Sequence, residues 1–209
     1  MSFTENEAYF SLTRVIPILT PASVASGVAV SRILFEAGLR FQEITLRTAP
    51  GLETIAALKR ELPELIVGAG SVLTPTMGET AIQAGAHFLV SPGTTQALLQ
   101  FAEHCSVPFL PGVSTVSEIM RVQALNCAVA KLFPVQLLGG VIFLQSLAGL
   151  LPSLKFCPTG GIDAQLAPTY LRLNNVLAIG GSWMAPGELI AKGGWAELRR
   201  LAEQGAALR

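Results

Sequence analysis

Short runs rich in β-branched and other apolar residues recur along this chain and alternate with longer stretches whose apolar positions repeat at helical spacing. The runs predict eight strands, at residues 15–20, 41–47, 65–72, 87–93, 108–114, 129–135, 155–161 and 176–182. The intervening stretches predict helices that include residues 24–38, 52–62, 94–105 and 115–126. Some of these helices end in Gly or Asn, as helix C-termini often do.

The regular spacing of these runs predicts the topology. Successive strands begin about 21 to 26 residues apart, which leaves room for a helical crossover and favours parallel pairing. No linker or low-complexity segment divides the chain. Eight strand–helix units therefore predict an α/β fold, a (β/α)8 TIM barrel that forms one domain over residues 1–209, with a short helical extension at residues 1–13.

The composition narrows the class of protein. Hydrophobic residues make up 51% of the chain and charged residues 13%, against about 25% charged in a typical soluble domain. This excludes a disordered chain and indicates extensive buried surface, in one large core or at a subunit interface. The 14 basic residues equal the 14 acidic ones, so no surplus of positive charge favours a nucleic acid partner.

Two segments bear on where in the cell the protein is expected. The start, MSFTENEAYF, has neither the basic nor the apolar region of a secretory signal. The longest near-apolar stretch, residues 137–151, is shorter than the roughly 20 residues that a membrane span needs. We therefore expect no membrane contact and a cytoplasmic protein.

The cysteines and histidines show no metal-binding pattern. Cys105, Cys127 and Cys157 are widely spaced and match neither a disulfide framework nor a CxxC pair, which indicates buried thiols in a reducing cytoplasm. His87 and His104 form no ligand cluster with acidic or cysteine residues. We expect neither a metal nor another cofactor.

Lys131 lies in the middle of the apolar strand VAKLFPV, on the same face as Val129 and Phe133. Burial disfavours the charged ammonium, and a neutral amine can attack a carbonyl carbon to form a Schiff base. The alternative is a structural lysine that pairs with Glu43 or extends to water. Because lysines are seldom buried, the position favours catalysis.

Glu43 and Arg47 share one face of the strand predicted at 41–47, so both side chains should point into the barrel. About 13 Å of strand separates them, which places Glu43 deeper and Arg47 nearer the mouth. Desolvation suits Glu43 to proton transfer, and a guanidinium suits Arg47 to binding a carboxylate. A salt bridge between the two, or with Lys131, is the structural alternative.

Two glycine-rich segments end the seventh and eighth predicted strands, TGG at residues 159–161 and GGS at residues 180–182. TIM barrels commonly bind phosphate at this place, through backbone N–H groups that glycines leave accessible. Glycines also merely end strands, but their presence on both strands favours a phosphate ligand.

Seven motifs, EITLR, GAGSVL, SPG, PGVSTVSE, KLFP, CPTGGI and IGGSW, occur in this order over most of the chain. With them the chain resembles the bacterial 2-keto-3-deoxy-6-phosphogluconate (KDPG) aldolase family, many of whose members also cleave 4-hydroxy-2-oxoglutarate. The resemblance implies a metal-independent class I aldolase of the Entner–Doudoroff pathway, which forms pyruvate and glyceraldehyde 3-phosphate. It also implies a homotrimer.

The resemblance further implies roles for individual residues. Lys131 is then the Schiff-base lysine and Glu43 the general acid and base, while Arg47 and Ser71 hold the pyruvate carboxylate. Other implied substrate contacts are Pro92 and Phe133, which shape the pyruvyl pocket, and Thr159. The implied phosphate site comprises Gly160, Gly161, Gly181 and Ser182.

The chain departs from the family where Ser71 replaces a common Thr, and where residues 135–138, VQLL, replace a segment that commonly begins Ala-Glu. The second departure removes a carboxylate near the site and bears on aldehyde specificity. The alternatives are an aldolase for an unphosphorylated or epimeric keto acid, a phosphosugar isomerase with Glu43 as base, and a barrel that binds a phosphorylated ligand without turnover. An imine trapped on Lys131 distinguishes an aldolase from the last two.

Overall fold

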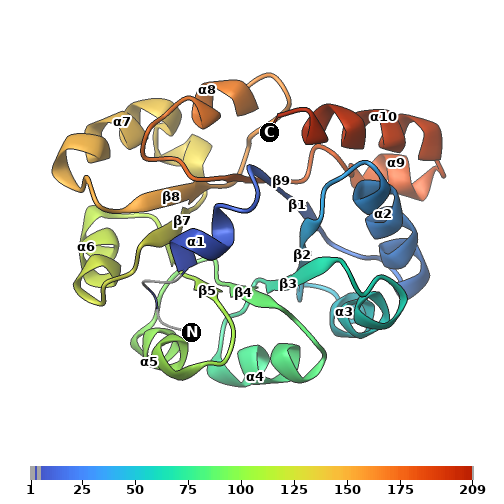
Figure 1. Cartoon of the computed structure of the whole chain (residues 1–209), viewed down its shortest axis with the longest axis horizontal. Helices are drawn as coiled ribbons and strands as arrows, with labels where there is room; N and C mark the ends of the chain where they lie inside the picture. Colours follow the sequence, from blue (N-terminus) through green and yellow to red (C-terminus); the bar gives the residue numbers. More distant parts are fainter. Residues whose placement is uncertain (1–2, 4–5, 209) are drawn as a thin grey trace.

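The computed structural model describes residue 3 and residues 6–208. Its strands lie at the centre of the molecule and helices surround them (Figure 1). The strands are β1 (Val15–Leu19), β2 (Phe41–Thr45), β3 (Ile66–Gly70), β4 (Phe88–Val90), β5 (Phe109–Leu110), β6 (Gly112–Val113), β7 (Val129–Leu132), β8 (Lys155–Pro158) and β9 (Ile179–Gly181). The helices are α1 (Asn6–Phe10), α2 (Val24–Glu36), α3 (Pro50–Glu61), α4 (Pro75–Gln83), α5 (Gln96–His104), α6 (Val116–Ala124), the 3-10 helix η1 (Val135–Leu138), α7 (Gly140–Leu150), α8 (Ala167–Leu171), α9 (Gly187–Ala191) and α10 (Trp195–Ala206).

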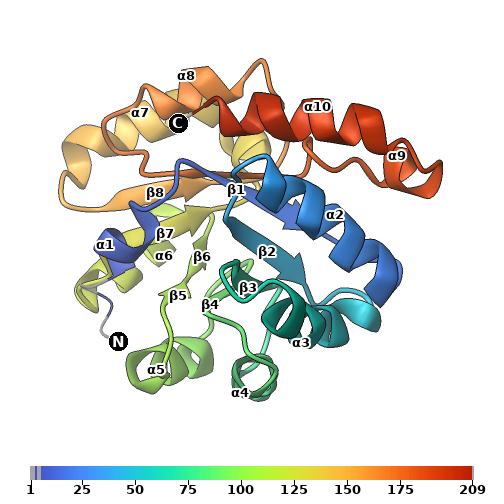
Figure 2. The same cartoon turned by 45° about the vertical axis from the view of Figure 1, so that its right-hand side comes forward.

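Parallel hydrogen bonding joins the strands into two sheets. One sheet has six strands in the order β5-β4-β3-β2-β1-β9, and the other has three in the order β6-β7-β8 (Figure 2). Within each sheet, strands that follow one another in the chain are paired, except that β9 pairs with β1. The helices between them serve as crossovers, as parallel pairing requires.

The two sheets meet at Pro111, inside the strand predicted at 108–114. Leu110 O accepts a hydrogen bond from the Ser91 N–H on the β4 side, and Pro111 O accepts one from the Lys131 N–H on the β7 side. Because proline has no N–H to donate, the strand is interrupted here and is divided into β5 and β6. At the other junction, the isolated bridge Phe156–Val176 joins β8 to the segment before β9, and the bridge Thr159–Gly180 joins the residue after β8 to β9.

These junctions bear on the predicted barrel. The α/β fold with parallel strands is confirmed, whereas the full (β/α)8 barrel stays a prediction, because the hydrogen-bonded strands form two separate open sheets. Each of the eight predicted runs contains strand, yet most strands are shorter than predicted. β2 ends at Thr45 instead of residue 47, and β7 ends at Leu132 instead of residue 135. Residues 46, 47, 133 and 134 belong to turns, and residue 135 begins η1, so these residues lie outside the sheet.

The helix predictions agree closely with the structure. α2, α3, α5 and α6 lie where they were expected, with ends that differ by at most two residues. Asn126, predicted as a C-terminal signal, adopts a left-handed backbone with φ 58° after α6. The near-apolar stretch 137–151 forms the end of η1 and α7. Within the described residues, no helix is long and apolar enough to cross a membrane.

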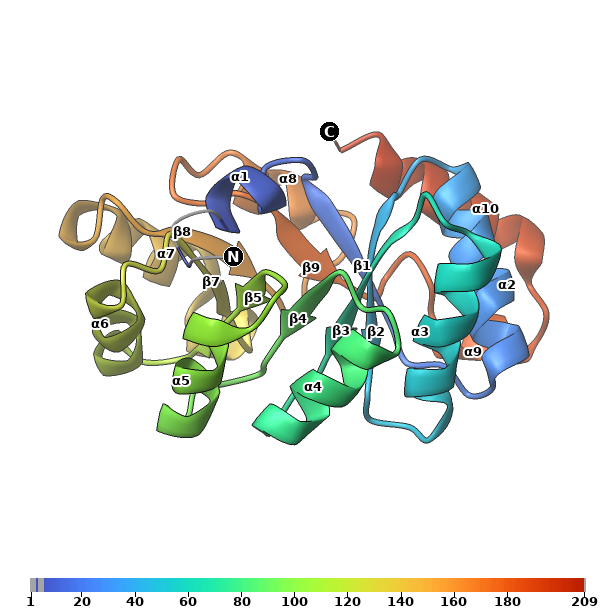
Figure 3. The same cartoon turned by 60° about the horizontal axis from the view of Figure 1, so that its bottom comes forward.

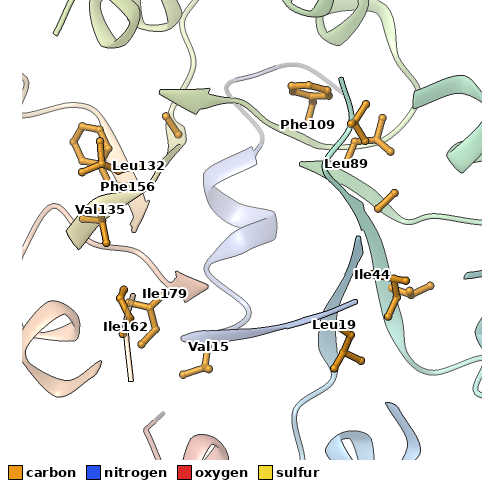
Figure 4. Close-up of a cluster of buried hydrophobic side chains, with 14 of the residues drawn as sticks. Val15, Leu19, Ile44, Leu89, Phe109, Leu132, Val135, Phe156, Ile162 and Ile179 are labelled. Carbon is orange, nitrogen blue, oxygen red and sulfur yellow. The ribbon is translucent and has the colours of Figure 1, made fainter. Parts of the chain in front are cut away.

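Buried side chains form two layers. One layer lies between strands and helices, and its labelled members, such as Leu19, Ile44 and Leu132, point outward from the strands (Figure 4). The second cluster fills the space between the strands at their N-terminal ends, and contains Phe41 and Phe88. The strand alternation of apolar residues thus supplies both the outer core and the interior.

Helix α1 covers this N-terminal end (Figure 3). Phe10 packs edge-on against Phe88, with ring centroids 5.5 Å apart, and Tyr9 packs edge-on against Phe41 at 5.4 Å. α1 lies inside the helical extension predicted at 1–13, of which residues 1, 2, 4 and 5 are outside the described part of the chain. With one end covered by aromatic rings, the interior is open toward the C-terminal ends of the strands.

Candidate active site

A pocket of about 310 Å³ lies at the C-terminal ends of the strands. It brings together every residue that the sequence singled out for chemistry, although these residues come from both sheets. The predicted residues that line it are Glu43, Arg47, Ser71, Pro92, Lys131, Phe133, Thr159, Gly160, Gly161, Gly181 and Ser182.

Lys131 and Glu43 form a buried ion pair in the depth of this pocket. Lys131 lies on β7 and is 6% exposed, and Glu43 lies on β2 and is 4% exposed. The Nζ–Oε1 distance is 3.4 Å. The Lys131 Nζ also lies 5.4 Å from the centre of the Phe133 ring, within range of a cation–π contact. The salt bridge that the sequence left open as a structural alternative therefore exists, in a geometry that also suits proton exchange between the two groups.

Gly70, the last residue of β3, makes room for Glu43. A Cβ atom at Gly70 would overlap the Glu43 carboxylate. Because β3 pairs with β2, a larger residue there would push the carboxylate away from Lys131. Steric crowding by Glu43 thus explains why the GAGSVL motif has a glycine at position 70.

Arg47 and Ser71 lie at the mouth. Arg47 follows the end of β2, is exposed, and donates a hydrogen bond from Nη2 to Thr20 Oγ1 at 2.9 Å. Glu43 is thus the deeper and Arg47 the outer residue, as predicted. Ser71 follows β3 in a left-handed conformation with φ 60°, which is costly for a residue other than glycine and is typical of functional loops.

The glycine-rich segments form another part of the pocket wall. Gly160 and Gly161 both have positive φ, 101° and 79°, so this turn after β8 depends on glycine. Gly160 O accepts a hydrogen bond from the backbone N–H of Gln136 at 3.3 Å. The Gln136 side chain donates from Nε2 to the hydroxyl of Tyr170 at 3.0 Å. The backbone of residue 136 therefore contacts the glycine turn, while its side chain contacts Tyr170.

Four further residues line the pocket without having been predicted for it: Ile18, Thr45, Ile162 and Trp183. Thr45 could have been found, because it lies two residues after Glu43 on the same strand face. Trp183 could not, because its indole covers Gly181 through a turn that no pattern in the sequence indicates.

Cys157 lies beside Lys131 in the strand register and is buried. Burial raises the pKa of its thiol to about 12, an effect that Lys131 opposes and Glu43 reinforces. The thiol therefore stays protonated at neutral pH and adds no charge to the pair. Cys105 and Cys127 are also buried, as expected of all three cysteines.

Within the part of the chain that the structure describes, no group of three or more His, Cys, Asp or Glu side chains is arranged to hold a metal ion. The chemistry that the described pocket residues themselves offer is that of an amine, a carboxylate and several hydrogen-bond donors.

Known proteins are similar to this chain in sequence and in fold. A 2-dehydro-3-deoxy-phosphogluconate aldolase from Pseudomonas aeruginosa is 41% identical over 191 residues, which cover 91% of this chain and 87% of the relative. A KDPG aldolase from Legionella pneumophila, solved with pyruvate captured at low pH as a covalent carbinolamine intermediate, has a TM-score of 0.92 at 35% identity, over 96% of this chain and 97% of that one.

The aldolase of Zymomonas mobilis ZM4 that acts on 2-keto-3-deoxy-6-phosphogluconate, solved with 3-phosphoglycerate, has a TM-score of 0.93 at 35% identity, over 100% of this chain and 98% of that one. These similarities confirm the resemblance that the seven sequence motifs indicated. Residues 7–201 match the family described as KDPG and KHG aldolase, which is nearly the whole chain. The chain therefore belongs to the KDPG and KHG aldolase family and is an aldolase.

Proposed function

We propose that this protein is a class I aldolase that cleaves 2-dehydro-3-deoxy-6-phosphogluconate into pyruvate and glyceraldehyde 3-phosphate. The observation that carries the proposal is the buried amine of Lys131 at 3.4 Å from the Glu43 carboxylate, at the bottom of a pocket whose other side is a glycine turn. The name of the Pseudomonas aeruginosa relative and the covalent pyruvate in the Legionella pneumophila structure support the same reaction.

The first step is attack by the neutral Lys131 Nζ on the C2 keto carbon of the substrate. The carbinolamine that forms loses water and becomes a protonated imine, which withdraws electrons from the neighbouring carbons. Glu43 is close enough to take the proton that the ammonium must lose before attack, and to donate a proton to the departing hydroxyl.

The second step breaks the C3–C4 bond. Glu43, acting through a water molecule, removes the proton of the C4 hydroxyl, and glyceraldehyde 3-phosphate leaves while the bond's electron pair enters the enamine on Lys131. Protonation at C3 restores the imine. Water then hydrolyses it to release pyruvate and regenerate the amine, so that the water lost in the first step is balanced.

The remaining pocket residues position the substrate in this proposal. Arg47 and Ser71 hold the pyruvyl carboxylate at the mouth, since a guanidinium can donate two hydrogen bonds to it. Pro92 and Phe133 bound the pyruvyl group, and Thr159 contacts the substrate. The phosphate binds at the glycine side, through Gly160, Gly161, Gly181 and Ser182.

Reductive trapping tests the Schiff base. Borohydride added with pyruvate should attach one pyruvyl group to Lys131, and to none of Lys59, Lys155 and Lys192, when the peptides are read by mass spectrometry. Lys131 is the lysine that lines the pocket. The Lys131→Arg variant serves as the control and should remain unlabelled, because a guanidinium stays protonated. Label on Lys155 would contradict the assignment.

A chelation experiment tests the metal-independent step. Prolonged dialysis against EDTA should leave the cleavage rate unchanged, since the imine supplies the electron sink. Loss of activity that an added divalent metal restores would contradict the scheme.

The family name also favours a second substrate, 4-hydroxy-2-oxoglutarate, which carries no phosphate. Hydrogen bonds to a charged group contribute about 1.5 to 3 kcal/mol each, and about 1.4 kcal/mol is tenfold. Cleavage of the phosphorylated substrate should therefore exceed that of 4-hydroxy-2-oxoglutarate by about two orders of magnitude in kcat/KM. Equal kcat/KM values for the two substrates would favour 4-hydroxy-2-oxoglutarate as the main substrate.

The wider organisation belongs to the same proposal. We infer a cytoplasmic homotrimer in which residues 1–209 act as one domain and the two sheets behave as one closed barrel. Exposed large apolar side chains such as Leu137 and Ile142 support association, and the bridges at Phe156 and Thr159 support closure. Sedimentation equilibrium tests the trimer, because a monomer mass would contradict it.

A further inference from the structure

A second hollow, of about 390 Å³, lies beside the catalytic pocket. It is formed where the chain runs from β1 into α2, and by α9 and the residues before it. α2 and α9 lie next to each other on the outside of the strands (Figure 1). The two hollows share Ile18, Arg47 and Ser182 in their walls, so they adjoin at the mouth of the active site.

Arg47 and Thr20 stand where the hollows adjoin. Arg47 donates to Thr20 Oγ1 at 2.9 Å, and Thr45 donates to the same oxygen at 3.0 Å. Arg47 and Thr20 are both exposed, so these side chains can change rotamer without disturbing the core. Exposed side chains thus form part of the division between the hollows, and a different rotamer of Arg47 would let a ligand in one hollow extend into the other.

The second hollow differs chemically from the catalytic pocket. Its inner wall includes the buried apolar residues Leu19, Val30 and Ala185, together with Ile190. Arg47, at its edge, is the charged residue among those that line it. Thr20, Ser23 and Ser26 also line the hollow and add hydroxyl groups. Most of the lining surface is nevertheless apolar, so it would remove an alkyl chain from water. Each methylene buried in this way improves binding about fourfold.

We propose that this hollow is a subsite for the alkyl tail of the aldehyde half of a substrate, so that the enzyme also acts on 4-hydroxy-2-keto acids with an unbranched apolar tail. The proposal rests on the proposed aldolase function. The tail would leave the catalytic pocket between Ile18 and Ser182, on the side of the pocket where the phosphate of the main substrate is proposed to bind.

The reaction is the reverse of cleavage and needs no further reactant. The enamine that pyruvate forms on Lys131 attacks the aldehyde carbon, the new C–C bond forms, and the aldehyde oxygen takes up a proton. Hydrolysis of the imine then releases the 4-hydroxy-2-keto acid. Pyruvate and aldehyde together contain all the atoms of the product, and no group is oxidised or reduced overall.

The test measures aldol addition of pyruvate to butanal, pentanal and hexanal. The wild-type enzyme should show kcat/KM rising about 15-fold from butanal to hexanal, because two more methylenes enter the hollow. The variant Ala22→Phe fills the hollow from a lining position that is exposed and outside the catalytic pocket. It should remove the rise and leave cleavage of the phosphorylated substrate within twofold of the wild type.

Ala25→Phe is the matched control, since Ala25 is exposed on the first turn of α2 but does not line the hollow. It should keep the full dependence on chain length. A flat series in the wild type, or a rise that survives in Ala22→Phe, would overturn the subsite. So would loss of the oligomer in Ala22→Phe, which would assign the hollow to a contact between copies of the chain.

Failure of the aldolase function itself would look different. In that case pyruvate would not be trapped on Lys131, and neither the phosphorylated substrate nor 4-hydroxy-2-oxoglutarate would be cleaved. If pyruvate is still trapped on Lys131 and the substrates are still cleaved, but kcat/KM does not rise with aldehyde chain length, only the subsite proposal is overturned.

Discussion

The two ends of the strands carry opposite chemistry although the same strands supply both. At the N-terminal end, Phe41 and Phe88 face inward and pack with helix α1. At the C-terminal end, Glu43 and Lys131 face inward and form an ion pair. On β2 the change from Phe41 to Glu43 takes two residues, about 7 Å of strand.

This difference shows how a small interior separates stability from chemistry. The aromatic end removes apolar surface from water and closes the floor of the pocket, so water and substrate reach the ion pair from the other end. Burial of two charges costs free energy that their mutual attraction offsets only in part. Substitutions at the aromatic end should therefore change stability, and those at the charged end should change activity.

The largest effect is expected for Lys131. Lys131→Arg keeps a positive charge beside Glu43 but cannot form an imine, so cleavage should fall by about 10⁴-fold or more, as in other enzymes that lose their nucleophile. Circular dichroism should show a folded protein. Steady-state kinetics measures the loss, and residual activity within a hundredfold of wild type would contradict the covalent route.

Glu43→Gln comes next. The amide keeps the shape and a hydrogen bond but cannot accept the proton, so kcat should fall about 10²- to 10⁴-fold, the usual share of general acid–base catalysis. Borohydride trapping of pyruvate should survive, although more slowly. Near-normal turnover would mean that another group moves the proton.

Phe88→Ala tests the aromatic end. Phe88 is fully buried and contacts the rings of Phe10, Phe41 and Tyr9, so the free energy of unfolding should fall by about 3–5 kcal/mol. Urea denaturation measures this, with Phe88→Leu as a milder control. Below the unfolding transition, kcat should stay within about twofold of wild type. A loss of kcat without a loss of stability would contradict the assignment of stability to the aromatic end and activity to the charged end.

Cys127, just before β7 and in the layer between strands and helices, tests whether that layer remains free of water at alkaline pH. Burial raises the pKa of its thiol to about 12, against about 8.5 in an unfolded chain. Between these values the unfolded state has lost a proton that the folded state keeps, so stability falls as pH rises. At pH 10 this thiol should cost about 2 kcal/mol relative to pH 7.

The Cys127→Ala variant isolates that contribution. Its free energy of unfolding should fall between pH 7 and pH 10 by about 2 kcal/mol less than that of the wild type. Urea denaturation at the two pH values measures the difference. An equal fall in the free energy of unfolding between pH 7 and pH 10 in both proteins would mean that water reaches the thiol in the folded state.

The smallest effect concerns the rim of the charged end. Ser182 is exposed and lines the pocket beside Gly181. Ser182→Ala removes the hydrogen bond that we propose Ser182 makes to the phosphate, so kcat/KM should fall about tenfold with the phosphorylated substrate and stay unchanged with 4-hydroxy-2-oxoglutarate. An equal loss with both substrates would place Ser182 at the pyruvyl half.

Much of the fold and the candidate site could be predicted because the relevant signals are local. Alternation along β2 placed Glu43 on the inner face, and the spacing of eight apolar runs indicated parallel strands. Since the C-terminal ends of parallel strands meet at one edge, the polar residues found there were expected together, and one pocket contains all of them. Their roles remain predictions.

Other features depended on contacts between distant residues. The ion pair joins Lys131 and Glu43, 88 residues apart, across two different sheets. No local sequence pattern predicts three further features: the open junction at Pro111, the cover of aromatic rings formed by α1, and the second hollow beside Arg47.

The physical reason is the range of the forces. Strand alternation and helix caps follow from the geometry of neighbouring residues, so the amino-acid sequence by itself determined which elements form and which face each side chain takes. Distances across the interior depend on how all the side chains pack at once. Only the tertiary structure could therefore decide that the Lys131 amine meets the Glu43 carboxylate, and that an apolar hollow opens beside them.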